Sequence, residues 1–180
     1  LEVEPGEVIA LVGRSGAGKT TLLTRLIPYL VAAGKRGSTI KHAHHNFDVD
    51  TPGKDSWEHR QAGAFEVLVS SGRRWALMHE LREEAEPSMW DLLAKLSAVD
   101  LVIVEGFKSG HHPKIEVFRA ANGKSLLHPG DPDIAGLATD TEIETRLPSA
   151  HLNDIPAIAA MVQRLAIDVA SPTARETVSG

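Results

Sequence analysis

Residues 8–21 read VIALVGRSGAGKTT and carry the strongest structural signal in the chain. A short apolar run precedes the first glycine, as is typical of a strand buried on both faces of a parallel sheet. The segment that follows matches the pattern G-x-x-x-x-G-K-S/T at Gly13, Gly18, Lys19 and Thr20. Apolar residues then recur at helical spacing for about four turns. The order of strand, glycine-rich loop and helix predicts a phosphate-binding loop.

The residue types in this loop suit nucleotide phosphates. Glycines let the backbone curl so that amide hydrogens point inward at a helix N-terminus, whose dipole favours anions. Lys19 would reach the β- and γ-phosphates, and the hydroxyl of Thr20 would bind a Mg²⁺ ion that bridges them. We expect Lys19 to act in catalysis as well as in binding. The expected nucleotide-binding residues of the loop are Gly13, Arg14, Ser15, Gly16, Ala17, Gly18, Lys19, Thr20 and Thr21.

A second short apolar run, LVIV at residues 101–104, ends in the acid Glu105. Ligands of open α/β sheets collect at the carboxyl ends of the strands. We therefore expect Glu105 to contribute to the magnesium site and to help orient the attacking water. Asp100 precedes the same strand, so we place it at the opposite edge of the sheet and discount it. The alternative for Glu105 is a carboxylate on a surface loop.

Length and composition exclude several classes of protein. The chain has 180 residues, no cysteine and a formal net charge of -5. It therefore cannot carry a thiolate zinc site, an iron–sulfur cluster or a disulfide scaffold, and a cytoplasmic location fits best. No apolar run is long enough to span a bilayer, and the acidic balance argues against broad binding of nucleic acid. We expect one nucleotide-binding domain over residues 1–170 and a disordered tail over 171–180. Because the sequence begins at Leu1 rather than at methionine, a targeting segment upstream is left open.

The remaining pattern alternates strands and helices. The sequence predicts strands over 38–44 and 133–138, a short helix with a capping box at Asp55 and Glu58, a helix from about 88 to 96, and a last helix over 155–167. Residues 65–70 and 74–80 are expected to form a hairpin or two adjacent strands. Strands 115–119 and 125–127 flank the turn signal Asn122-Gly123, which predicts another hairpin. Such alternation predicts an α/β, three-layer P-loop NTPase fold with a mostly parallel central sheet and an additional β-hairpin region.

The polar stretch after the second strand offers two kinds of candidate metal ligand. Asp48 and Asp50 could approach Mg²⁺ or the attacking water, and an exposed acidic loop is an equally good interpretation. His42 and His44 share one face of a strand, which permits a chelate, with His45 beside them. Histidines next to a phosphate site more often simply donate hydrogen bonds.

A local set of cations offsets the acidic total. These residues would suit a phosphate-bearing pterin or a partner protein, although for any single one a solvated surface charge is the better interpretation. The set consists of Lys41, Lys54, Arg60, Lys108 and Lys114.

The usual guanine-reading pattern, N/T-K-x-D, is absent, and Asp140 at the end of a predicted strand is our candidate instead. Its carboxylate could accept hydrogen bonds from both guanine N1–H and N2–H, an arrangement that adenine does not offer. The alternative is that Thr139-Asp140 caps the next turn.

The first residues of the chain resemble the start of an ABC-transporter ATPase, but no LSGGQ-like signature or later Asp-Glu pair follows. Three other segments together resemble the MobB family of molybdopterin-guanine dinucleotide biosynthesis adaptors: TIKHAHHNFDVDTPGKDSWEHRQAGA (39–64), LVIVEGFK (101–108) and HPKIEVFR (112–119). The resemblance implies a fold of the dimeric SIMIBI GTPase class, GTP binding with weak hydrolysis, and assistance to a separate transferase that joins GMP to molybdopterin. The choice of GTP over ATP rests mainly on this resemblance.

The leading functional hypothesis is a GTP-binding adaptor with slow Mg²⁺-dependent GTPase activity in molybdenum cofactor maturation. GTP and Mg²⁺ are the expected cofactors. The expected partners are molybdopterin or molybdenum cofactor, a nucleotidyltransferase and a second copy of the chain, with neither nucleic acid nor membrane. One alternative is a small-molecule kinase that passes the γ-phosphate to an acceptor hydroxyl, for which Arg73 and Arg74 are the one adjacent arginine pair. Another is a nucleotide-responsive binding module without catalysis.

Overall fold

The structure is a computed structural model that describes residues 6–43 and 47–170. Contacts between residues divide the chain into two units, Leu1–His42 with Met89–Gly180, and Ala43–Ser88. Whether the two units form the one domain expected over residues 1–170 stays a prediction. The tail expected at 171–180 lies outside the described residues.

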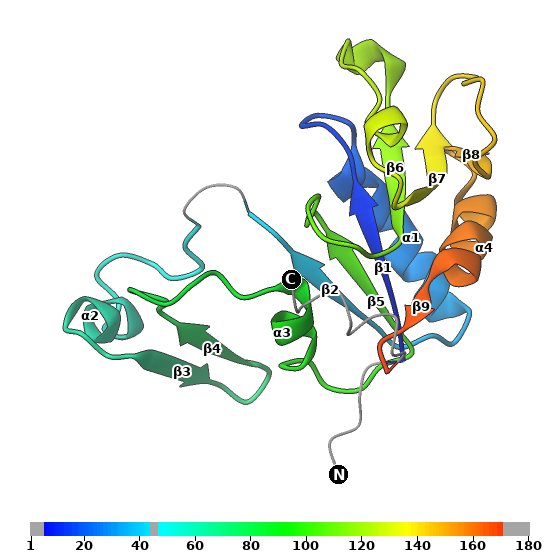
Figure 1. Ribbon diagram of the computed structural model, residues 1–180. Coiled ribbons are helices and arrows are strands. Elements are labelled where there is room, and N and C mark those ends of the chain that lie inside the picture. The colour runs from blue at the N-terminus through cyan, green and yellow to red at the C-terminus, as the bar shows by residue number, and fades with distance from the viewer. Residues whose placement is uncertain (1–5, 44–46, 171–180) are drawn as a thin grey trace. The chain divides into compact units, whose positions relative to one another are not determined.

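A seven-stranded sheet forms the centre of the first unit (Figure 1). Its strands are β1 (Glu7–Val12), β2 (Gly37–Lys41), β5 (Leu101–Glu105), β6 (Lys114–Phe118), β7 (Ile134–Thr139), β8 (Ser149–His151) and β9 (Ile167–Asp168). Six of them follow the order β2-β5-β1-β6-β7-β8 and are parallel, and β9 pairs antiparallel with β1. The carboxyl ends of β1, β5 and β6 therefore meet at one edge of the sheet.

The two faces of β1 belong to separate cores. Ile9 and Leu11 pack in a core with buried residues of α1 (Lys19–Ala32) and α4 (Ile155–Leu165). The alternate residues of the same strand belong to a second core with α3 (Met89–Leu93). Because both faces of the strand are covered by helices, its apolar run has no polar alternation. The expected α/β fold with a mostly parallel sheet is confirmed.

Local sequence features decide which face of α1 is buried and where α4 begins. Leu22, Leu26 and Leu30 place one stripe of α1 in the core, and α1 continues through Pro28 without interruption. The N-terminus of α4 is capped by Asp154, whose carboxylate accepts the N–H of Ala157 over 3.0 Å. Across residues 6–43 and 47–170, no helix combines the length and apolar character needed to cross a membrane.

The hairpin predicted around Asn122-Gly123 is wrong. Strand β6 uses its two edges for parallel pairing with β1 and β7, so no edge remains for an antiparallel partner over residues 125–127. The Asn-Gly dipeptide instead ends a 3₁₀ turn, Ala120–Asn122, with Gly123 at a φ of 63°. The sequence also missed β8 and β9, which are three and two residues long.

The second unit contains one short helix and the predicted hairpin. The hairpin consists of β3 (Glu66–Ser70) and β4 (Trp75–His79) and pairs antiparallel, as expected. Helix α2 (Asp55–Gln61) also forms where the sequence predicts a helix. The capping box at its start is wrong, because Lys54 occupies the cap position and no side-chain cap bond forms.

Candidate functional site

The glycine-rich loop, residues 13–20, joins the end of β1 to the start of α1. Gly13 has a φ of 151°, and a Cβ atom there would lie 2.5 Å from the carbonyl oxygen of Val117. Gly18 adopts the left-handed conformation at the N-cap of α1, with a φ of 92°. The backbone path thus depends on glycine at positions where other residues would clash or be strained. Thr20 and Thr21 are exposed at the first turn of the helix.

The side chain of Lys19 folds back over the loop. Its Nζ donates to the carbonyl oxygens of Gly13 and Arg14, over 2.9 and 3.4 Å. The pKa of Lys19 lies below its ordinary value, mainly because the ammonium is partly buried, while Glu105 acts in the opposite direction. The further cations that lower this pKa are Lys108, Lys41 and Lys124. A cluster of cations surrounds this loop, as an anion site requires.

Two of the residues expected to hold magnesium, Thr20 and Glu105, belong to the first unit, and the structure brings them together. Glu105 is the last residue of β5, and its Oε1 accepts the hydroxyl of Thr20 over 3.2 Å. Asp100 lies at the other end of that strand, where its carboxylate accepts the N–H of Arg36 over 2.7 Å. The choice of Glu105 over Asp100 therefore agrees with the geometry.

Residues after β6 cover the glycine-rich loop, a contact that the sequence analysis did not predict. Asn122 Nδ2 and Lys124 Nζ each donate to the carbonyl oxygen of Ser15 over 3.0 Å. The guanidinium of Arg119 lies against Gly18, where an added Cβ atom would be 3.4 Å from Nη2. The available signal was the position of Arg119, which directly follows a strand that ends at the same edge of the sheet.

Asp140 directly follows β7, close to Arg119. Its Oδ1 accepts the N–H of Ala120 over 2.8 Å, and its Oδ2 lies 3.6 Å from Arg119 Nη1. A cavity of about 690 Å³ opens beside it, with Thr141 and other residues of the segment before β8 in its lining. The carboxylate is thus partly engaged, yet it borders a space large enough for a nucleobase.

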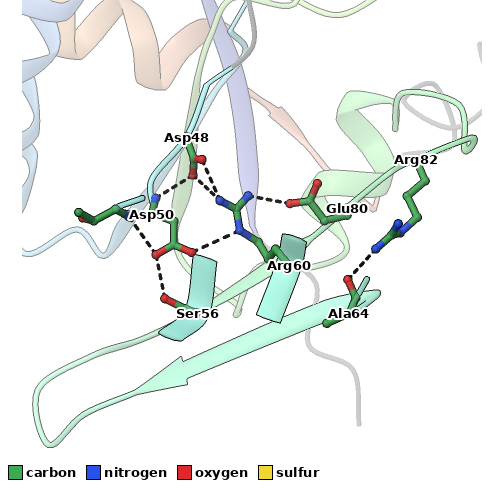
Figure 2. A network of polar contacts seen from close by, with 8 residues as sticks. Asp48, Asp50, Ser56, Arg60, Ala64, Glu80 and Arg82 are labelled. Atoms are coloured by element: carbon green, nitrogen blue, oxygen red, sulfur yellow. Dashed lines mark hydrogen bonds and ion pairs between the residues drawn. The ribbon is translucent and has the colours of Figure 1, made fainter. Parts of the chain in front are cut away.

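The other two acids predicted to hold magnesium lie in the second unit and bind an arginine there (Figure 2). Asp48 binds Arg60 through both carboxylate oxygens, over 2.9 and 2.8 Å, and Asp50 binds its Nε over 3.3 Å. Glu80 completes the set, 2.7 Å from Nη1. The pKa of Asp48 lies below its ordinary value, first because it accepts the N–H of Asp50 and then because of Arg60. These contacts in turn raise the pKa of Arg60 further.

The predicted cation set does not act as one group. Lys114 is 2% exposed and binds Asp131 over 3.0 Å, and Arg60 is bound to carboxylates. Lys41 and Lys108 contribute instead to the electrostatics of the glycine-rich loop. Burial and ion pairing thus remove part of the set from solvent.

The histidine chelate stays a prediction, because His44 and His45 lie outside the described residues. His42 stacks on Phe107 with ring centroids 4.4 Å apart. Within the parts of the chain that the structure describes, no group of three or more histidine or acidic side chains is arranged to hold a metal ion.

The comparisons that cover most of the chain agree on one family. Residues 8–140 match the family model described as molybdopterin guanine dinucleotide synthesis protein B, MobB. The chain is 41% identical over 160 residues to the molybdopterin-guanine dinucleotide biosynthesis adapter protein of Escherichia coli (strain K12), covering 86% of this chain and 90% of that protein. The adapter protein of Haemophilus influenzae is 40% identical over 159 residues, covering 87% of both. A crystal structure of molybdopterin-guanine biosynthesis protein B superposes with a TM-score of 0.70 at 25% identity, over 88% of this chain and 99% of that chain.

Proposed function

Because this chain belongs to the MobB family of molybdopterin guanine dinucleotide synthesis proteins, we propose that it binds GTP, hydrolyses it slowly, and assists guanylyl attachment to molybdopterin. Membership of the family shows its general role: it is an adapter protein of molybdopterin-guanine dinucleotide biosynthesis. The observation that carries the nucleotide proposal is the loop of residues 13–20, with Lys19 folded over it and Glu105 beside Thr20.

The electrostatics of the loop support the binding of a triphosphate. Partial burial and the neighbouring cations disfavour the charged form of Lys19, so an anion would relieve this cost. Lys19 would exchange the carbonyl oxygens of Gly13 and Arg14 for phosphate oxygens. Backbone N–H groups at the start of α1 would bind the remaining phosphate oxygens.

The oxygen atoms of Thr20 and Glu105 fit magnesium. They lie 3.2 Å apart, and hydroxyl and carboxylate oxygens are the ligand types that Mg²⁺ prefers. These two residues would hold the ion, whose charge would offset the charge of the phosphates. Thr20 would then give up its hydrogen bond to Glu105.

Hydrolysis would be slow because the site offers weak activation of water. Water would attack the γ-phosphorus in line, and the bond to the bridging oxygen of GDP would break. Lys19 would stabilise the developing charge, and Glu105 would orient the water. A part for Asp48 and Asp50 in this step requires Arg60 to release them first.

Asp140 is the proposed reader of guanine. Each of its oxygens faces one donor, Ala120 N–H or Arg119, and a carboxylate oxygen can accept a second hydrogen bond. The adjoining cavity gives a purine room to reach it. Guanine would offer two N–H donors to this carboxylate, whereas adenine would place a ring acceptor against it.

The hairpin of the second unit supports the proposed homodimer. Leu68 and Leu77 are cross-strand partners, 61% and 48% exposed, and Trp75 on the same face is 68% exposed. Apolar side chains gathered on one face often mark a protein contact. A second copy of the chain would cover this face. The nucleotidyltransferase that transfers GMP would bind another surface of the protein, and the complex would be cytoplasmic. Sedimentation should show a dimer for wild type and a monomer for Leu77→Lys, and a monomeric wild type would refute the dimer.

Calorimetric titration of GTP and ATP, with Mg²⁺ and with chelator, tests the nucleotide proposal. Wild type should bind GTP in a 1:1 ratio and more tightly than ATP, and Lys19→Ala should weaken GTP binding by about a hundredfold or more. Lys35→Ala is the matched control, because Lys35 is an exposed lysine beyond the end of α1. Equal affinity for ATP would rule out the role of Asp140, and unchanged affinity in Lys19→Ala would rule out the loop.

Phosphate release separates the adapter from the kinase. Turnover well below about 1 s⁻¹ and independent of acceptor hydroxyls is expected for the adapter, since kinases typically reach about 1–100 s⁻¹. Glu105→Gln should slow release further without abolishing GTP binding. Fast release that depends on an acceptor would favour the kinase and overturn the proposal.

A further inference from the structure

A cavity of about 310 Å³ lies beside the glycine-rich loop, within the first unit. Val12 and Arg14 line it on the side of the loop, Lys108 on the side of the segment after β5, and Leu126 and Asp131 on the side of the segment after β6. This volume is at the lower end of the range for small-molecule sites. The cavity can therefore hold one small ring ligand next to the proposed phosphate site.

Two buried charged side chains of β6 hold one wall of this cavity. Lys114 and Glu116 are 2% and 1% exposed, in a strand that lies between β1 and β7. Glu116 accepts the backbone N–H of Leu127 over 2.7 Å and that of His128 over 2.9 Å. Lys114 Nζ donates to Asp131 Oδ2 over 3.0 Å. Both charged side chains thus bind the segment that lines the cavity.

Burying these two charges costs free energy, which would be unnecessary if the wall of the cavity needed no defined shape. A buried charge loses its hydration, and apolar side chains of similar volume are often as stabilising in the same place. Charged hydrogen bonds from alternate positions of a central strand fix the backbone of the wall with a directionality that apolar packing lacks. A ligand site needs its contact groups held in this way.

The groups on the walls select a flat heterocycle that carries a phosphate. Leu126 and Leu127 offer apolar surface to a ring. Arg14 and Lys108 are cations, the groups that bind phosphate oxygens. Asp131 presents a carboxylate that can accept hydrogen bonds from a ring amino group.

We propose that this cavity binds a phosphorylated pterin, with its phosphate between Arg14 and Lys108 and its amino group on Asp131. The inference rests on the proposed function, because molybdopterin is a pterin that carries a phosphate. Arg14 belongs to the glycine-rich loop, and Lys108 is close enough to that loop to lower the pKa of Lys19. The pterin and the phosphates of GTP would therefore lie next to each other, on two sides of the same loop.

Fluorescence titration of the full chain with 6-hydroxymethylpterin phosphate tests this site, with unphosphorylated 6-hydroxymethylpterin as the comparison ligand. Lys108→Ala should weaken binding of the phosphorylated ligand by about tenfold and leave the weaker binding of the other ligand unchanged. Asp131→Asn should weaken both ligands by about tenfold. Lys95→Ala, an exposed lysine outside the cavity, should match wild type. Thermal unfolding of each variant shows whether Asp131→Asn remains folded, and Lys108→Ala tests the site independently.

The same samples are titrated with GTP, so that the two proposals fail separately. GTP binding without binding of the pterin phosphate would overturn the cavity assignment and leave the proposed function standing. Pterin binding without GTP binding would support the cavity and refute the GTP proposal. If the pterin phosphate bound both cavity variants as tightly as wild type, it would bind outside the cavity and the inference would be overturned. Loss of pterin binding at saturating GTP would overturn it as well.

Discussion

The guanidinium of Arg60 donates to both carboxylate oxygens of Asp48, over 2.9 and 2.8 Å (Figure 2). The same side chain binds Asp50 and Glu80, and Asp50 Oδ1 also accepts the hydroxyl of Ser56 over 2.8 Å. One cation thus joins the segment before α2 to the helix itself and to the end of the hairpin. Asp48 and Asp50, which the sequence predicts as magnesium ligands, are bound to Arg60 in this structure, and their part in magnesium binding stays a prediction.

Replacing Arg60 should loosen the second unit and leave the first unit intact. Arg60→Met leaves three carboxylates without their common cation, so amide exchange in α2 and β3 should accelerate by about tenfold or more, with β1 and β5 unaffected. Arg82→Met is the matched control, because Arg82 donates to the carbonyl oxygen of Ala64 over 3.0 Å. Equal effects of the two variants, measured by hydrogen exchange, would show that the carboxylate network contributes nothing special.

Gly13→Ala should damage both the fold and the proposed GTP binding. A methyl group there would lie 2.5 Å from the carbonyl oxygen of Val117, so either β6 or the loop must move. Gly34→Ala is the control, because Gly34 also has a positive φ, 82°, but an added Cβ meets nothing within 4 Å. We expect the control to lose about 1–2 kcal/mol from strain alone and Gly13→Ala to lose more. Chemical unfolding and GTP titration of both variants measure the difference, and equal losses would mean that the close approach to Val117 is unimportant.

Local patterns in the sequence predicted the parts of the fold that depend on neighbours along the chain. β1 and α1 follow from apolar periodicity, and the pairing of Thr20 with Glu105 follows from the rule that parallel strands end at one edge. The contacts of Asn122 with the glycine-rich loop could not be found in this way, since 107 residues separate it from Ser15. Only the strand order brings the two segments together.

The wrong hairpin prediction has a physical origin outside the local sequence. The Asn122-Gly123 dipeptide favours a tight turn, but pairing of β6 with two parallel neighbours decides what the turn connects. Asp48 and Asp50 alternate in a polar loop, as metal ligands can, and Arg60 of the following helix binds both of them, so their part in magnesium binding stays a prediction. For the Asn122-Gly123 turn, pairing with strands distant in the sequence outweighs the local preference, and local patterns do not contain that contact.

His79 should make the hairpin more stable at acidic pH than at alkaline pH. Hydrogen bonds to Glu66, first, and to Glu84 raise its pKa above the ordinary value of 6.5. The protonated form therefore stabilises the hairpin fully below pH 6.5, and this contribution is lost as pH rises through the raised pKa. NMR titration of the imidazole should show the raised pKa in wild type and a lower one in Glu66→Gln. The control Glu83→Gln, an exposed neighbour, should titrate like wild type. A His79 pKa at or below 6.5 in wild type would contradict the prediction.

His112 should make the first unit less stable in acid. Burial, and then the nearby charge of Lys114, lower its pKa to about 4, although Asp133 and Asp131 act in the opposite direction. Between about pH 6.5 and 4 the unfolded chain therefore binds a proton that the folded chain does not bind. The free energy of unfolding consequently decreases by up to about 3 kcal/mol as the pH falls through this range. Amide exchange of β1 and β5 as a function of pH measures this loss, and His112→Gln should flatten it. His111→Gln is the matched control, because that neighbouring side chain is 73% exposed, and it should keep the wild-type slope. A wild-type slope in His112→Gln would show that another group controls the acid sensitivity.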